Sequence, residues 1–96
     1  MTKALFVRLE AKPGKESAVA AFLKSALPLV EDEAGTRTWY AWQAGPSTFG
    51  IYDTFDDEDG RTARLSGKVA AALMEKADEF FPTPPSVEQL VVLAEK

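Results

Sequence analysis

Two alternating, aromatic-rich segments decide the fold: TRTWYAWQ at residues 36–43 and TFGIYDTF at residues 48–55, joined by AGPS at residues 44–47. Such alternation is typical of β-strands, and a short link containing Gly and Pro predicts a β-hairpin. Both tryptophans and both tyrosines of the chain lie in this hairpin. Aromatic rings between a sheet and helices favour a site for a flat organic ligand, although the hairpin does not identify that ligand.

The segments outside the hairpin predict two further strands and two helices. Alternation predicts strands at residues 4–10 and 87–94. Apolar residues at helical spacing predict a helix over residues 16–32, ended by Ala34-Gly35, with a kink or a fresh start at Pro28. A second helix is predicted from the acidic start at residues 56–59 to Phe80, with Gly67 as a weak point inside it.

The resulting order of elements is β-α-β-β-α-β. It predicts an α+β, ferredoxin-like fold, in which a four-stranded antiparallel sheet carries two helices on one face. Residues 1–96 are expected to form one small domain, because the chain shows no internal linker, repeat or low-complexity tract.

Composition excludes several classes of function. The chain has no cysteine and no histidine, which excludes disulfides and removes the commonest ligands of haem and zinc. Its net charge of −4 argues against nucleic acid and anionic membranes as partners. The apolar run at the N-terminus breaks too early for a signal peptide, and no stretch approaches a membrane span. We therefore expect a cytoplasmic protein.

The strands are apolar on both faces, which predicts a second covering layer. Tyr40 and Trp42 oppose Trp39 and Ala41 in one strand, and the closing strand contains four consecutive apolar residues at 90–93. A sheet with one face in water alternates more cleanly, and two helices cover only one face. For so small a domain the simplest cover is a second copy, so we expect a homodimer packed sheet to sheet.

Several segments resemble the antibiotic biosynthesis monooxygenase family, small proteins that form dimeric α+β barrels. The matching segments are KPGKE at residues 12–16, EAG at 33–35, TWYAW at 38–42 and FGIYDTFDDE at 49–58. The resemblance covers nearly the whole chain, and the order of elements carries most of it. It implies oxidation of polycyclic phenols or quinols by molecular oxygen, without metal or flavin.

Some members of that family degrade haem with an asparagine, a tryptophan and a histidine. The resemblance places Val7, Phe55 and Arg64 at those positions. All three depart from the haem pattern, so the resemblance implies no haem and no other cofactor. The first two positions are also associated with activity in quinol-oxidising members. Their departure leaves a second function open, that of a non-oxidative binding module or isomerase.

Two charged residues are the candidates for chemistry. Arg64 is expected to pair with a phenolate or a developing oxyanion, and the alternative is a solvated surface arginine beside the acidic run. Asp53 shares its strand parity with Ile51 and Phe55. It is therefore expected to point toward the helices and act as a base, and the alternative is a salt bridge at the rim.

Aromatic side chains supply the expected contacts to a small aromatic substrate. Tyr40 and Tyr52 are candidate hydrogen-bond donors to a substrate carbonyl, with packing at a dimer interface as the alternative. Trp39 and Trp42 lie on opposite faces of one strand, so one is expected to line the cavity and the other the interface. The predicted substrate-binding set comprises Trp39, Tyr40, Trp42, Tyr52, Phe55 and Val7.

Overall fold

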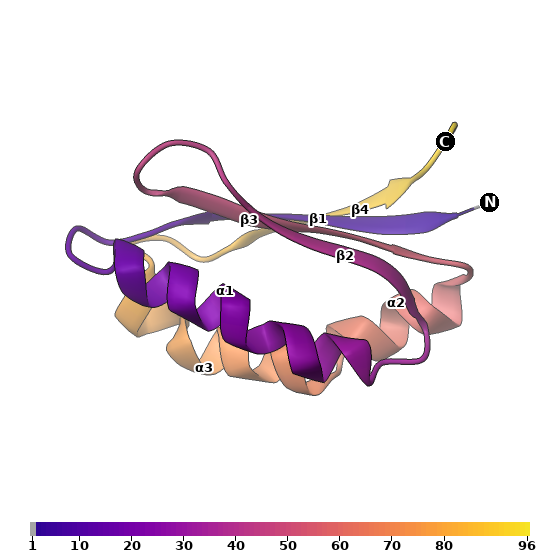
Figure 1. Ribbon diagram of the computed structural model, residues 1–96, viewed down its shortest axis with the longest axis horizontal. Coiled ribbons are helices and arrows are strands. Elements are labelled where there is room, and N and C mark those ends of the chain that lie inside the picture. The colour runs from indigo at the N-terminus through magenta and orange to yellow at the C-terminus, as the bar shows by residue number, and fades with distance from the viewer. Residues whose placement is uncertain (1) are drawn as a thin grey trace.

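A computed structural model describes residues 2–96, and over this range four strands pair as one antiparallel sheet. The strands are β1 (Lys3–Glu10), β2 (Thr36–Gln43), β3 (Thr48–Phe55) and β4 (Ser86–Val91), in the order β2-β3-β1-β4. All helices of the described residues lie on one face of this sheet (Figure 1). The predicted α+β, ferredoxin-like fold and the predicted hairpin are confirmed.

The closing strand is shorter than predicted. β4 ends at Val91, three residues before the end of the predicted strand. The pairing register gives the reason, because Val91 pairs with Lys3, the first residue of β1. β1 does not extend beyond that pair, so β4 has no further strand residues to pair with. Within residues 2–96 one more backbone hydrogen bond follows, from the Val92 N–H to the Thr2 carbonyl.

The helix α1 (Glu16–Glu31) runs unbroken through Pro28, so a fresh start at that proline is wrong. Proline has no N–H, so Pro28 cannot donate the helical hydrogen bond to the Lys24 carbonyl. Both residues are exposed, so water can take the place of that donor. Gly35 does not cap the helix, which ends three residues earlier at an ordinary right-handed Asp32. Gly35 instead permits a close approach, because a Cβ there would lie 2.8 Å from the Cα of Gly60.

The second predicted helix is wrong as a single element, because it forms two. The helix α2 (Glu58–Leu65) begins at Asp57, whose side chain accepts a hydrogen bond from the Gly60 N–H at 2.9 Å. The helix α3 (Lys68–Phe80) begins after Gly67, which has an extended backbone. The predicted weak point is therefore a complete break, and it lets α2 lie under the end of the sheet where β2 begins (Figure 1).

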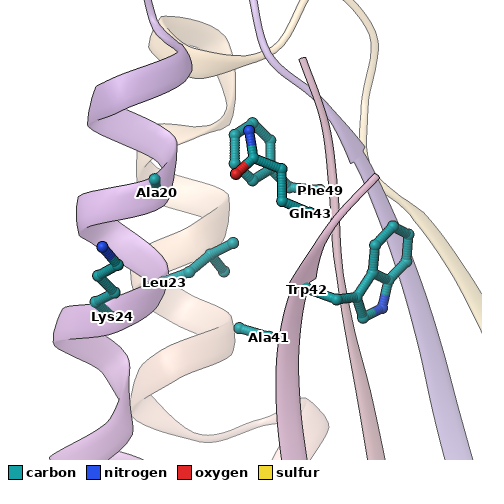
Figure 2. A pocket seen from close by; sticks show the side chains of 7 residues that line it. All are labelled: Ala20, Leu23, Lys24, Ala41, Trp42, Gln43 and Phe49. Carbon is teal, nitrogen blue, oxygen red and sulfur yellow. The ribbon is translucent and has the colours of Figure 1, made fainter. Parts of the chain in front are cut away.

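The core lies between the sheet and α1 and α3. Leu9, Phe49 and Ile51 contribute from the sheet, and Val19 contributes from α1. The opposite side, here called the open face, carries a stack of Phe6 on Trp42 with ring centroids 5.7 Å apart. In Figure 2, Trp42 points away from α1, whereas the neighbouring Ala41 points toward the helices.

The open face also holds the two tyrosines. Tyr40 and Tyr52 are cross-strand partners, and Tyr52 also pairs with Phe6 of β1. The Tyr40 side chain is 60% exposed. The sheet therefore carries aromatic residues on both faces, as the sequence pattern indicates, and sheet-to-sheet pairing stays a prediction.

Candidate functional site

A cavity of about 190 Å³ lies between the helix-facing side of the sheet and helices α2 and α3. Its wall is almost entirely apolar, and the connector before β4 closes one side of it. The apolar lining residues are Leu5, Val7, Ile51, Leu65, Val69, Ala70, Leu73, Met74, Pro84, Pro85 and Val87. Two charged side chains complete the wall, Asp53 and Arg64.

Asp53 and Arg64 form a buried ion pair at this cavity. The Arg64 Nε donates a hydrogen bond to Asp53 Oδ2 at 2.9 Å. Asp53 is 1% exposed and Arg64 is 6% exposed. The predicted orientation of Asp53 toward the helices is therefore confirmed, although its salt bridge is buried rather than at a rim. A solvated surface position for Arg64 is wrong.

The surroundings of Asp53 change its acidity. Burial raises the pKa of Asp53 from 3.8 to about 6, because the charged form loses its hydration, while the Arg64 charge and hydrogen bond oppose that rise. A carboxylate with a pKa near 6 is ionised at neutral pH yet binds a proton readily. It therefore has the acidity of a general base that works near neutral pH.

Two further buried or half-buried charged residues, which the sequence did not single out, lie near the pair: Glu33 contacts Arg64, whereas Arg61 pairs with Glu58. Glu33 Oε1 lies 3.7 Å from the Arg64 Nε and accepts a hydrogen bond from Thr36 Oγ1 at 3.0 Å. Arg61 is buried one turn before Arg64 and donates to the backbone carbonyls of Ala4 and Leu90 at 3.2 and 3.0 Å. Arg61 and Arg64 are three residues apart, so they lie on one face of a helix. This spacing was the feature of the sequence from which their common burial could have been predicted.

The structure divides the predicted substrate-binding set between the two faces of the sheet. Val7 lines the cavity. Phe55 is fully buried on the same side, outside the cavity wall, and Trp39 packs there against the core. Trp42 and the two tyrosines lie on the open face and do not reach Asp53 or Arg64.

A second, smaller hollow of about 120 Å³ lies between α1 and β2 (Figure 2). Lys24 is its single charged lining residue, and Phe49 forms its floor with Leu23. This groove brings no acid or base together with a partner, so the cavity at Asp53 is the better candidate site. Residues 2–96 contain no group of three or more acidic side chains placed to hold a metal ion. None of the helices described is long and apolar enough to cross a membrane.

Solved structures similar to this chain agree with this fold. The crystal structure of NE2512, a protein of unknown function from Nitrosomonas europaea, is 56% identical with a TM-score of 0.97, over 99% of this chain and 92% of that one. A candidate antibiotic biosynthesis monooxygenase from Chloroflexus aurantiacus is 16% identical with a TM-score of 0.77, over 100% of this chain and 97% of that one. Another from Bordetella bronchiseptica is 16% identical with a TM-score of 0.78, over 97% of this chain and 98% of that one.

The comparisons differ in what they establish. The first is a close relative, whereas likeness at 16% identity establishes the fold alone. The predicted resemblance to the antibiotic biosynthesis monooxygenases is thus confirmed at the level of the fold. No family model matches the chain, and no curated protein does.

Titration of Asp53 tests the electrostatics of the site. We expect the carboxyl carbon of Asp53, followed by NMR, to titrate near pH 6 in the folded protein and near 3.8 in urea. Because the folded state then holds the proton more tightly than the unfolded state, Asp53 adds stability below pH 3.8 that is lost as pH rises to about 6. The free energy of unfolding of the native chain minus that of Asp53→Asn should fall over this window. A difference that rises with pH there would contradict the account.

Proposed function

Because the chain belongs to one family with the Nitrosomonas europaea protein of unknown function and shares its fold with candidate antibiotic biosynthesis monooxygenases, we propose that it is a cofactor-independent monooxygenase. Its substrate is a phenol, a quinol or an aromatic polyketide, and its oxidant is molecular oxygen. The observation that carries the proposal is the ion pair of Asp53 and Arg64 in the wall of an apolar cavity.

In the proposed reaction Asp53 removes the proton from a substrate hydroxyl. The resulting anion is electron-rich, and it supplies the electrons that reduce oxygen. One oxygen atom enters the ring system as a carbonyl at a ring carbon that loses its one hydrogen, and the substrate hydroxyl becomes the second carbonyl of a quinone. The other oxygen atom leaves as water with that hydrogen and the hydroxyl proton, so no further reductant is needed. Asp53 returns its proton as the product forms.

The other residues of the cavity support this step. The Arg64 guanidinium lies beside the carboxylate and stabilises negative charge as it develops on the substrate oxygen. The apolar wall, with Leu5, Ile51 and Leu73 among its residues, accepts an aromatic ring and keeps water from the anion. Each role belongs to a residue that the structure brings to the same cavity.

A second function, that of an isomerase, draws on the same observation. A carboxylate with a pKa of about 6 in an apolar cavity is also suited to moving a proton between two carbon atoms of a substrate. Such a reaction consumes no oxygen, whereas solvent deuterium enters the product under anaerobic conditions. Oxygen consumption therefore separates the two functions.

Oxygen uptake tests the proposed function. We expect uptake above the protein-free rate with at least one hydroquinone or naphthol, in buffer freed of metal ions. Asp53→Asn should lower that rate by at least about 100-fold, because general-base catalysis is lost. Asp78→Asn makes the same chemical change on an exposed position of α3 and should leave the rate unchanged. Uptake equal to the protein-free rate with every compound would refute the monooxygenase.

We further propose that two copies of the chain pack through their open faces. The proposal is supported by the exposed Tyr40 and by the stack of Phe6 on Trp42, since such aromatic groups are enriched at interfaces. The other proposed partner is a small aromatic substrate. Neither nucleic acid nor a membrane is proposed as a partner. A cytoplasmic location stays a prediction.

Mass in solution tests the dimer. Sedimentation at micromolar concentration should give twice the 10.5 kDa of one chain. Tyr40→Lys places a charge on the open face and should give a single chain, whereas Leu27→Lys, at an exposed apolar position on α1, should leave the dimer intact. A native chain that sediments as a monomer would contradict sheet-to-sheet pairing.

A further inference from the structure

Arg64 lies between two carboxylates that come from different parts of the chain. Its Nε is 2.9 Å from Asp53 Oδ2 on β3, and it is 3.7 Å from Oε1 of Glu33, a residue in the link between α1 and β2. One guanidinium therefore faces two carboxylates. When both carboxylates are ionised, the three groups carry a net negative charge, and a proton on Asp53 brings them to neutrality.

The position of Glu33 is fixed by its own turn. Thr36 donates two hydrogen bonds to Glu33, from its Oγ1 to Oε1 at 3.0 Å and from its N–H to the backbone carbonyl at 3.1 Å. The close contact of Gly35 with Gly60 packs the same turn against α2, the helix that carries Arg64. The turn thus holds the carboxylate against α2 whether or not a charge is present on β3.

The two carboxylates differ in their contact with water. Asp53 is 1% exposed, whereas the side chain of Glu33 is 21% exposed. A hollow of about 100 Å³ lies beside Glu33, and its wall includes Gly60 and Arg64. A carboxylate that keeps part of its hydration loses less on becoming charged than one that is fully buried. Of the two, Asp53 is therefore the one that binds a proton first.

The other charged groups near the ion pair are engaged elsewhere. On α2 the Arg61 Nη2 lies 2.7 Å from Glu58 Oε2, so these two side chains neutralise each other. Asp32 and Lys68 are exposed and line a separate hollow at the end of α1. Within residues 2–96, none of these four groups forms an ion pair with Arg64. The residues that β1 and β4 contribute to the cavity wall carry no charge: Leu5, Val7 and Val87.

The proton transfer of the proposed reaction removes one of the two carboxylate charges. When Asp53 takes the substrate proton, its attraction for Arg64 falls. A buried guanidinium that loses its counter-ion is strongly destabilising. Glu33 is the carboxylate that remains at the guanidinium. It can therefore keep Arg64 in the cavity wall while negative charge develops on the substrate oxygen.

We propose that Glu33 is a positioning residue of the site, which holds Arg64 in the cavity wall whenever Asp53 carries a proton. The inference deepens the proposed function and rests on it in taking Asp53 as the group that gains and returns a proton. Glu33 acts through Arg64 and does not touch the substrate. A role for Glu33 in the stability of its turn alone would not depend on the charge of Asp53, and this difference is measurable.

Urea unfolding of a double-mutant cycle tests the dependence on Asp53, and Asp53→Asn stands for the protonated acid. Well above pH 6, where native Asp53 is ionised, Glu33→Gln should change the folding equilibrium constant little. It removes attraction to Arg64 and repulsion from Asp53 together. In the Asp53→Asn background the same change should lower that constant at least about tenfold, because Arg64 loses its last carboxylate. Equal effects in the two backgrounds would overturn the proposal.

Titration of Asp53 gives a second measurement, which needs only a single substitution. Burial raises the pKa of Asp53 to about 6 against the opposing effect of Arg64, and the Glu33 charge adds to the rise. By NMR, the Asp53 carboxyl carbon should therefore titrate at a lower pH in Glu33→Gln than in the native chain. Glu31→Gln makes the same chemical change at the exposed end of α1 and should leave this pKa unchanged.

The titration also decides the case in which the double variant does not fold. An Asp53 pKa in Glu33→Gln equal to that in the native chain would overturn the proposal, because Glu33 would then have no electrostatic contact with the pair. A lower value that Glu31→Gln does not reproduce would support it.

The outcome is separable from that of the proposed function. Non-additive unfolding without oxygen uptake would refute the monooxygenase and leave Glu33 as the second counter-ion of Arg64. Oxygen uptake with additive unfolding would refute the role of Glu33 and leave the monooxygenase standing. If both proposals hold, the rise of the uptake rate with pH follows the ionisation of Asp53, and it should move to lower pH in Glu33→Gln.

Discussion

The buried ion pair of Asp53 and Arg64 is the interaction on which the site depends. Two charges removed from water are tolerated only when they are paired and hydrogen-bonded, and the loss of either partner leaves the other uncompensated. The backbone is arranged accordingly. Asp57 caps the start of α2, the contact of Gly35 with Gly60 docks that helix against the start of β2, and the break at Gly67 separates it from α3. In this position the Arg64 side chain reaches Asp53 on β3 from the helix-facing side of the sheet.

The two faces of the sheet hold different groups. The helix-facing side carries the ion pair, the cavity and the indole N–H of Trp39, which meets no hydrogen-bond partner within residues 2–96. The open face carries the stack of Phe6 on Trp42 and the exposed Tyr40. The hairpin contributes to both, because its side chains alternate between faces. Half of the hairpin's aromatic rings, those of Tyr40, Trp42 and Tyr52, therefore lie on the side away from the proposed chemistry.

Local patterns predicted the strands and the orientation of Asp53, because alternation with period two fixes which face a strand residue takes. They did not predict the burial of Arg64, since an arginine is ordinarily solvated and its partner lies eleven residues earlier on another element. The cavity could not be predicted from the sequence either. Apolar spacing at Val69 and Leu73 predicts a buried helix face, but whether that face meets the sheet or a gap depends on how α2 and α3 break apart.

The central claim is that a hydroxyl of the ligand lies against Asp53 inside the cavity. A crystal structure of the chain grown with 1-naphthol measures this most directly. The account predicts the naphthol oxygen within hydrogen-bond distance of Asp53 Oδ1, with the rings against Ile51 and Leu73. A naphthol bound in the groove between α1 and β2, or one whose hydroxyl points toward the exposed lining residue Met74, would contradict it.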